Sequence, residues 1–231
     1  MIELLQAQPF FSDKTIESCT RLEHQGYCNE NYLLCAESKK YIARKLLRED
    51  IDRDFEWAIQ TLAYRQDITA EPLVFDKENG FMLFAFLEGE HKRELDKHGL
   101  KFLAKTLQKL HSIKIDAKPI KIDIENKTDE VLKAFETIAN YPKEYVLCHN
   151  DLNPQNIFFS NEVRFIDWEY AGVNDRYFDM ACVCVEFKLK KKEVDTFLKS
   201  YCADKMIVRE KLEAYKTIYI ALCKQWFKEN T

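Results

Sequence analysis

The hydrophobic pattern of this chain changes its period near Glu88 and Gly89. Before this point, apolar, aromatic and β-branched residues form short runs of strand length, separated by turn-forming residues. After it, apolar residues recur at the three- and four-residue spacing of amphipathic helices. We therefore expect an α+β fold with two lobes, a small antiparallel sheet over residues 1–88 and a mostly helical lobe over residues 89–231.

The same patterns predict individual elements. Strands are expected over residues 15–23, 27–37, 40–47, 73–76, 81–87, 145–148, 157–159 and 163–166. Helices are expected over residues 50–65, 95–111, 128–140, 177–188, 193–202 and 208–227. The dipeptide Asn79-Gly80 predicts a tight hairpin between two of the strands.

Composition and charge exclude several classes of protein. Lys and Arg number 35 and Asp and Glu 39, so the formal net charge is −4, which argues against a general nucleic-acid binder. No apolar run approaches the ~20 residues of a membrane span. The N-terminal segment has an early Glu3 and no basic region, unlike a signal peptide. The 8 cysteines form no C-x-x-C pair, so we expect free thiols and a cytoplasmic location.

The most informative segment runs from Cys148 to Phe159, between two short predicted strands. Within it, His149, Asp151 and Asn156 have the spacing H-x-D-x-x-x-x-N, and Asp167 follows one hairpin later. Phosphoryl-transfer catalytic loops present their groups in this order. Carboxylate and amide oxygens are also the ligands that Mg²⁺ takes together with substrate phosphates. The segment therefore predicts a magnesium-dependent phosphoryl-transfer site.

Each group has an expected task in such a loop. Asp151 is expected to orient and deprotonate a substrate hydroxyl, while Asn156 and Asp167 hold the metal. Pro154 stiffens the loop between them. The alternative is an ordinary Asn/Asp-Pro turn. A turn does not require this spacing followed by an Asp in Phe-Ile-Asp-Trp, so we favour the catalytic interpretation.

Three motifs stand in order in this part of the chain: H-N-D-L-x-x-x-N over 149–156, I-D-W-E-Y-A-G over 166–172, and F-D-M-A over 178–181. They resemble the signatures of the choline/ethanolamine kinase branch of the aminoglycoside-phosphotransferase superfamily. The Asp-Phe-Gly and Ala-Pro-Glu motifs of protein kinases are absent from the sequence. The resemblance implies a protein-kinase-like fold, ATP and Mg²⁺ as cofactors, and phosphoryl transfer to an alcohol.

The resemblance also assigns roles to lobes and residues. It implies that the lobe over residues 1–88 binds the nucleotide and that the lobe over 89–231 carries the catalytic groups and the acceptor site. His149 belongs to the catalytic motif. Asp179 resembles the Asp that braces the catalytic loop by accepting backbone N–H bonds. Both are expected to support the site without touching the substrate.

Weaker similarities suggest nucleotide-binding residues in the first lobe. Residues 25–32 are similar to the family's phosphate loop and include Asn29, although Gln25 and Cys28 replace a Gly and a hydroxyl residue. A plain hairpin turn is the alternative for this segment. Glu88 lies in a segment that resembles the hinge, whose backbone usually binds adenine.

A cation for the nucleotide phosphates is expected on the strand over residues 40–47. Strand alternation sends Arg44 and Lys45 to opposite faces, so only one of them can face the nucleotide. We favour Arg44, with Glu56 of the following helix as its partner. The alternative for Glu56 is a solvated position on the helix surface.

The acceptor is expected to be a small amino alcohol, with choline as the first candidate. A quaternary ammonium group requires an aromatic cage and a nearby carboxylate. The candidates in the second lobe are Trp168, Glu169, Tyr170, Tyr177, Tyr219 and Trp226, of which we favour Glu169, Tyr170 and Trp226. Other acceptors, namely ethanolamine, thiamine, an aminoglycoside or a sugar, remain open. A catalytically inactive nucleotide-binding module is a further alternative, and the oligomeric state is not predicted.

Overall fold

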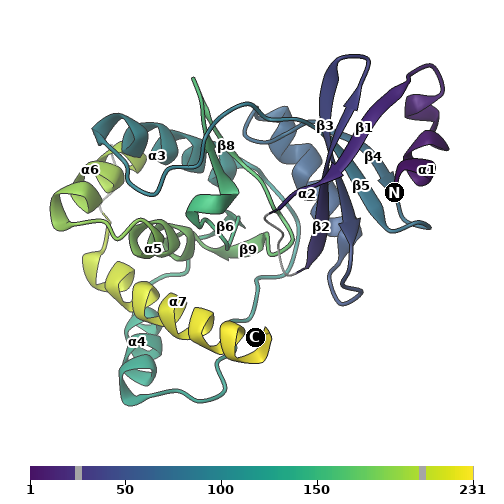
Figure 1. Ribbon diagram of the computed structural model, residues 1–231. Helices are drawn as coiled ribbons and strands as arrows, with labels where there is room; N and C mark the ends of the chain where they lie inside the picture. Colours follow the sequence, from purple (N-terminus) through teal and green to yellow (C-terminus); the bar gives the residue numbers. More distant parts are fainter. Residues whose placement is uncertain (24–27, 203–206, 231) are drawn as a thin grey trace. The chain divides into compact units, whose positions relative to one another are not determined.

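The computed structural model describes residues 1–23, 28–202 and 207–230, and Figure 1 traces its helices and strands. The chain divides into two compact units, Met1–Glu88 and Gly89–Thr231. The first is built on a sheet and the second mainly on helices, as the change of hydrophobic period indicates.

The first unit holds a five-stranded antiparallel sheet in the order β1-β2-β3-β5-β4 among the described residues. Its strands are β1 (Ile16–Arg21), β2 (Asn29–Ala36), β3 (Lys39–Leu46), β4 (Pro72–Asp76) and β5 (Phe81–Ala85). Three helical segments accompany them: α1 (Ile2–Gln6), η1 (Pro9–Phe11) and α2 (Arg53–Arg65). Pro72 opens the edge strand β4, a position where a missing N–H costs no central ladder bond.

Side-chain alternation divides this sheet between two apolar layers. One face packs against residues of α1 and η1, and the other holds Met82 together with Trp57 of α2. Arg44 of β3 pairs in register with Met82 of β5. Because paired residues share a face, the Arg44 side chain points to the α2 side of the sheet.

The β4–β5 hairpin carries the predicted Asn79-Gly80 turn. Gly80 has a φ of +64°, a left-handed conformation that Gly adopts without steric cost. The Asp76 carboxylate accepts the Asn79 backbone N–H at 3.0 Å and closes the turn. The hairpin prediction is confirmed.

The second unit surrounds α5 with other helices and two small antiparallel sheets. Its helices are α3 (Lys97–Ser112), α4 (Asp129–Ala139), η2 (Pro154–Asn156), α5 (Arg176–Glu186), α6 (Lys191–Tyr201) and α7 (Arg209–Asn230). Its strands are β6 (Tyr145–Cys148), β7 (Ile157–Phe159), β8 (Val163–Phe165) and β9 (Gly172–Asp175). Strand β6 pairs with β9, and β7 pairs with β8.

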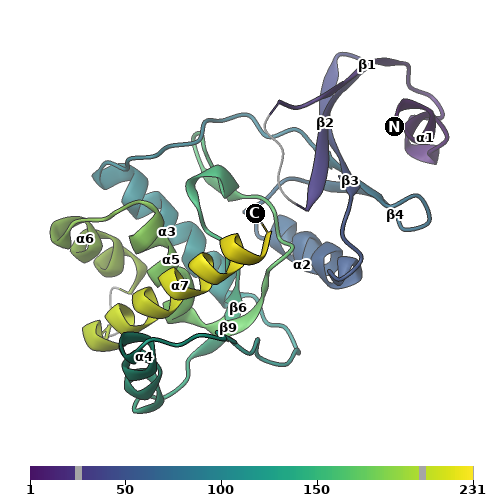
Figure 2. The same cartoon turned by 60° about the horizontal axis from the view of Figure 1, so that its bottom comes forward.

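Helix α5 lies at the centre of this unit, with its residues from Arg176 to Cys184 buried. Helix α7 packs on both α4 and α5, and α3 packs on α6, an arrangement visible in Figures 1 and 2. Side-chain caps begin several of these helices: Asp96 caps α3, Thr128 caps α4 and Asp175 caps α5. Each cap satisfies a backbone N–H that the first helical turn leaves open.

A buried lysine fixes the first turns of α7. Lys211 is 1% exposed, and its Nζ lies 2.7 Å from the Asp175 carboxylate and 2.8 Å from the Pro142 carbonyl oxygen. Glu144 completes the cluster at 3.4 Å. Because a buried ammonium group requires close partners, this cluster fixes α7 against the start of α5.

Four elements were not predicted from the sequence: α1, β9 and the short helices η1 and η2. Helix α1 has five residues, too few for a helical period to be recognised. Strand β9 has the sequence Gly-Val-Asn-Asp, whose Gly, Asn and Asp are typical of turns, yet it is buried and paired with β6. Tertiary pairing has outweighed local propensity there. Within the described ranges, no helix combines the length and apolar character needed to cross a membrane.

Candidate active site

The His149–Asn156 loop leaves β6 and reaches β7 through the short helix η2. Its second residue, Asn150, has a φ of +66°, a conformation that Asn tolerates better than most residues. The Asn150 side chain donates to the Tyr170 carbonyl oxygen at 2.9 Å and accepts from Asn174 Nδ2 at 2.9 Å. These bonds fix the sharp turn that follows β6.

The Asp179 carboxylate of α5 holds the start of this loop. Its Oδ2 accepts the His149 backbone N–H at 2.9 Å, and its Oδ1 accepts the Asn150 backbone N–H at 2.8 Å. Asp179 is fully buried. Charge-assisted bonds of this kind contribute about 1.5–3 kcal/mol each, so Asp179 is well placed to hold the backbone in its strained conformation.

The His149 ring links the loop to the strand that precedes Asp167. Its Nδ1 accepts the Asp151 backbone N–H at 3.3 Å, so this nitrogen carries no proton. The proton therefore sits on Nε2, which donates to the Ile166 carbonyl oxygen at 2.9 Å. One buried imidazole ring thus bonds to the backbone at Asp151 and at the residue before Asp167.

The Asp151 carboxylate lies at the surface of this network and keeps both oxygens in hydrogen bonds. Asn153 Nδ2 donates to Oδ1 at 3.0 Å, and Asn156 Nδ2 donates to Oδ2 at 2.7 Å. Burial raises the pKa of Asp151, and the neighbouring Asp167 charge adds to this, while the hydrogen bonds from Asn153 and Asn156 oppose it. A carboxylate in this environment has a stronger tendency to accept a proton than an exposed Asp.

Asn156 and Asp167 are brought together by the β7–β8 hairpin. The Ile166 backbone N–H donates to the Asn156 carbonyl oxygen at 3.0 Å. The Asn156 side-chain nitrogen donates to the Asp151 carbonyl oxygen at 3.0 Å as well as to its carboxylate. Because both amide hydrogens are directed to Asp151, the amide oxygen is the atom left to bind a cation.

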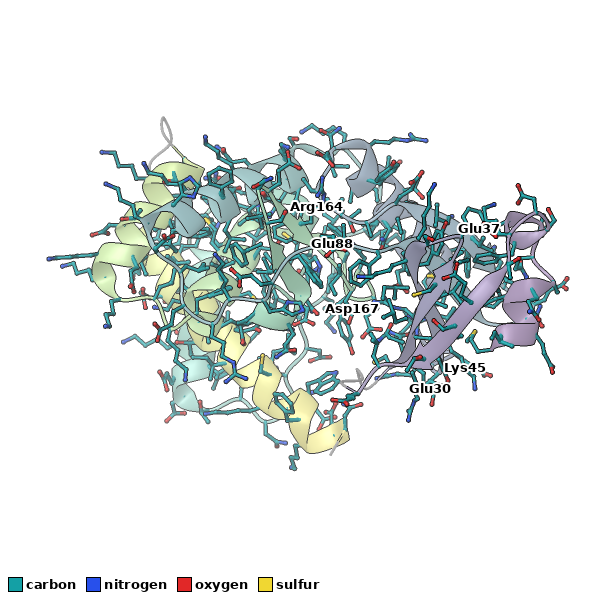
Figure 3. The ribbon with its side chains drawn as sticks, turned by 45° about the horizontal axis from the view of Figure 1, so that its top comes forward. Glu30, Glu37, Lys45, Glu88, Arg164 and Asp167 are labelled. Carbon is teal, nitrogen blue, oxygen red and sulfur yellow. The ribbon has the colours of Figure 1, made fainter. Side chains whose placement is uncertain are left out.

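Asp167 follows β8 directly and has a φ of +68°; Figure 3 labels its position. A non-glycine residue held in this conformation is typical of functional sites. The carboxylate of Asp167 and the amide oxygen of Asn156 form a hard oxygen donor set. This set fits Mg²⁺, which is commonly bound by one or two carboxylates, waters and substrate phosphates.

The acceptor candidates Tyr170 and Trp226 are in contact. Trp226 of α7 donates its indole Nε1–H to the Tyr170 hydroxyl at 3.1 Å, and both side chains are half-buried. Glu169 is also half-buried, in the turn that connects β8 to β9. The structure therefore brings Tyr170 and Trp226 together from positions 56 residues apart.

Sequence reasoning missed a further carboxylate, Glu186, at the end of α5. Tyr219 of α7 donates its hydroxyl to Glu186 Oε1 at 2.8 Å. Burial raises the pKa of Cys223 to about 11, and the charges of Glu186 and Asp151 add to this effect. The Glu186–Tyr219 hydrogen bond thus joins the end of α5 to α7. The one signal in the sequence was an acidic residue that ends the apolar run over residues 180–185.

In the first unit, Arg44 and Glu56 form a buried ion pair. Arg44 Nη1 lies 3.1 Å from Glu56 Oε1, and Arg44 Nε donates to Asn31 Oδ1 at 3.3 Å. Lys45 lies 3.8 Å from Glu30 on the neighbouring strand, and Figure 3 labels both residues. Arg44 and Lys45 lie on opposite faces of β3, as strand alternation predicts; the resemblance to the family favoured Arg44 as the one that faces the nucleotide.

A second arginine, Arg53, extends this ion pair and was not predicted. Its Nη1 lies 2.7 Å from Glu56 Oε2, and its Nη2 donates to Asn29 Oδ1 at 3.0 Å. Glu56 and Asn29 are both buried. The Arg53–Glu56 spacing of three residues on a helix is the signal that could have predicted this contact.

Two further expectations concern the ends of the nucleotide-binding region. Gln25, Gly26 and Tyr27 of the expected phosphate loop lie outside the described residues. Glu88 is exposed, with its carboxylate 3.7 Å from Lys40 Nζ. An exposed side chain there is compatible with a residue whose backbone, and not its side chain, contacts a ligand.

The His149–Asn156 loop presents Asp151 and Asn156, and Asp167 follows the next hairpin, an arrangement typical of phosphoryl-transfer sites. The profile of the choline/ethanolamine kinase family matches residues 86–229, and the chain belongs to that family. It is therefore related to phosphotransferases that act on an alcohol group.

Known proteins with similar sequences and structures agree with this family. Protein LicA of Haemophilus influenzae is 27% identical over 206 residues, which are 77% of this chain and 61% of LicA. This chain thus spans less than two thirds of that relative's length. Choline kinase LicA from Streptococcus pneumoniae has a TM-score of 0.83 at 22% identity, covering 98% of this chain and 89% of that chain.

A structure of LicA in complex with AMP has a TM-score of 0.73 at 24% identity, covering 99% of this chain and 87% of that chain. These likenesses concern the fold. The α+β, protein-kinase-like fold expected from the sequence is confirmed.

Proposed function

We propose that this chain is an ATP- and Mg²⁺-dependent kinase that phosphorylates the hydroxyl group of choline. The main support is the arrangement around Asp151. Its carboxylate accepts a hydrogen bond from Asn156, and its backbone N–H is linked through the His149 ring to the residue before Asp167. Membership of the choline/ethanolamine kinase family supports the same chemistry.

In this proposal the catalytic groups act mainly by positioning and electrostatics. The Asp151 carboxylate orients the acceptor hydroxyl and takes its proton. Asn156 and Asp167 would hold Mg²⁺, which when bound neutralises negative charge on the transferred phosphoryl group. Asp179 and the His149 ring keep these side chains fixed, so little reorganisation is needed during transfer.

Nucleotide binding is assigned to the first unit. Arg44 would contact the nucleotide phosphates, since a guanidinium matches phosphate oxygens in charge and geometry. Glu56 holds this guanidinium at 3.1 Å. Asn29 would contribute at the phosphate loop, and the backbone near Glu88 would contact the base. The LicA complex with AMP supports a nucleotide as one substrate.

Replacing Glu56 by Gln is expected to raise the KM for ATP by about three- to tenfold, with a smaller change in kcat. The reason is that Glu56 fixes both Arg44 and Arg53, and a neutral amide holds two cations less firmly. Steady-state kinetics with varied ATP measure this effect.

Glu30 provides a matched control for this change. It lies 3.8 Å from the exposed Lys45, and solvent-exposed ion pairs contribute little. Glu30→Gln should leave the KM for ATP unchanged. Equal changes in both variants would contradict the special role of Glu56.

The acceptor site is proposed near Asp151, among Glu169, Tyr170, Glu186, Tyr219 and Trp226. A quaternary ammonium ion has no N–H donor, so it is recognised by aromatic faces and by nearby negative charge. The Trp226–Tyr170 contact and the Glu186–Tyr219 contact supply both. Glu186 is an addition to the set expected from the sequence, whereas Tyr219 was already among the aromatic candidates.

The deciding experiment compares acceptors with the whole chain and Mg·ATP. Turnover is measured with choline, ethanolamine and a neutral sugar alcohol, alongside the shift in melting temperature that each produces. Turnover with choline above the others supports the proposal. Preference for ethanolamine, which the family also includes, would change the acceptor, and a chain that binds Mg·ATP without turnover would be an inactive nucleotide-binding module.

Replacing Trp226 by Ala is expected to raise the KM for choline about 2- to 30-fold while the KM for ATP stays within a factor of about two. A cation over an indole face gains about 0.5–2 kcal/mol, and about 1.4 kcal/mol corresponds to a factor of ten. Removing a contact made in both ground and transition states changes KM more than kcat.

Ile220→Ala on the same helix is the control, because Ile220 is an exposed apolar residue of α7. It should leave choline kinetics unchanged. A Trp226→Ala variant with normal choline kinetics would remove Trp226 from the acceptor site. A variant with a strongly lowered melting temperature would instead make Trp226 a packing residue.

A further inference from the structure

A hydrogen-bond chain connects α6 to the catalytic loop through residues that the proposed chemistry does not use directly. The Tyr201 hydroxyl, at the end of α6, lies 2.5 Å from His111 Nδ1. His111 Nε2 lies 3.0 Å from Asp179 Oδ2. The same Asp179 carboxylate accepts the backbone N–H groups of His149 and Asn150. The side chains in this series of hydrogen bonds are buried: Tyr201 is 3% and His111 7% exposed.

The donors and acceptors in this series of hydrogen bonds follow from its geometry. Burial raises the pKa of Tyr201 strongly, so its phenol keeps the proton and can donate it in a hydrogen bond. The nearest acceptor is His111 Nδ1, which then carries no proton. With Nδ1 accepting from the phenol, Nε2 is the ring nitrogen that can donate to Asp179. Each donor in the chain meets one acceptor.

The neighbouring Cys148 does not disturb this assignment. Its thiol, the His111 ring and the Asp179 carboxylate lie within 4.8 Å of one another, a grouping that could suggest a metal site. Burial raises the pKa of Cys148 well above its usual value, so the thiol stays protonated, and it lies 3.7 Å from the carbonyl oxygens of Asn174 and Asp175. With the His111 nitrogens engaged by Tyr201 and Asp179, the group is a hydrogen-bond network.

We propose that Tyr201 is a positioning residue for phosphoryl transfer: its hydroxyl selects the His111 tautomer that supports Asp179, and Asp179 holds the strained backbone from which Asp151 projects. The inference rests on the proposed role of Asp151. Without the Tyr201 hydroxyl, the proton of His111 can move to Nδ1, and Nε2 then offers Asp179 a lone pair in place of an N–H. The carboxylate would lose one of its three donors.

Tyr201→Phe is expected to lower kcat about three- to tenfold, with the KM values for ATP and the acceptor within a factor of about two. The ring of Phe fills the same volume, so packing is retained and only the hydrogen bond is lost. The ¹⁵N shifts of the His111 ring provide a second readout that does not need turnover. Wild type should show the pure Nε2–H tautomer, and Tyr201→Phe a mixture.

Tyr215→Phe is the matched control, because Tyr215 is another buried phenol that stacks on Tyr177 at 6.3 Å. It should lower the melting temperature comparably without changing kcat or the His111 spectrum. In a His111→Gln background, Tyr201→Phe should cause no additional loss of kcat, since a residue acting through His111 is non-additive with it.

The outcomes separate this inference from the proposed function. A cationic or Nδ1–H His111 in the wild type would overturn the inference, whatever the acceptor proves to be. Equal loss of kcat from Tyr201→Phe in both backgrounds would also overturn it. A wild-type chain that turns over no acceptor would defeat the proposed function, while the ring shifts would still test the tautomer that Tyr201 selects.

Discussion

Asp151→Asn is expected to lower kcat by about 10²–10⁴, the usual contribution of a positioned acid–base group, while Mg·ATP still binds. The amide has nearly the same shape as the carboxylate but cannot accept the hydroxyl proton. Because burial and the Asp167 charge raise the pKa of Asp151, its charged form does not stabilise the fold at neutral pH. The free energy of unfolding should therefore be unchanged or higher in the variant.

Three measurements test this expectation together: single-turnover kinetics, titration of Mg·ATP, and thermal unfolding. Asp116→Asn, at an exposed position of the same unit, serves as the control and should behave like wild type. A variant at Asp151 that keeps more than about a tenth of kcat would exclude this residue as the general base.

Asp167→Ala is expected to abolish turnover and to weaken the binding of Mg·ATP at least tenfold, while the affinity for metal-free ATP changes little. The variant deletes the main carboxylate proposed for the metal. Isothermal titration with and without Mg²⁺ separates the two effects, because only the magnesium-dependent part of the affinity should disappear.

Backbone strain requires a second variant at this position. Asp167 has a φ of +68°, which Ala tolerates less well than Asp or Asn. Asp167→Asn keeps the local conformation and removes the charge, so it should reproduce the loss of magnesium-dependent affinity with a near-normal melting temperature. Wild-type affinity for Mg·ATP in the Asn variant would place the metal elsewhere.

The sequence predicted the local parts of the fold and of the candidate site. Most strands and helices follow from apolar periodicity, and the spacing of His149, Asp151 and Asn156 fixes their order in one loop. Arg44 and Glu56 could be paired in advance because the strand resembles the family's cation-bearing strand, and alternation allows only one of Arg44 and Lys45 to face the nucleotide. In each case a short stretch of chain carries the whole signal.

The remaining contacts depend on tertiary packing, which leaves little trace in the sequence. Tyr201 meets His111 across 90 residues, and Tyr219 meets Glu186 across 33. Nothing in the periodicity of α6 or α7 distinguishes these tyrosines from core residues. Strand β9 was missed for the same reason, since its pairing with β6 compensates for a turn-like composition.

The two ends of α7 are held in different ways. Near the start, Lys211 is buried against Asp175, whereas Trp226 and the exposed Phe227 lie in the last turns. The Asp179 carboxylate that holds the start of the catalytic loop, and the His111 and Tyr201 side chains behind it, come from α5, α3 and α6. We expect substitutions near the end of α7 to change the region around Tyr170 more than the backbone at Asp151. A lineage with this architecture could exchange one alcohol substrate for another while its phosphoryl-transfer machinery stays unchanged.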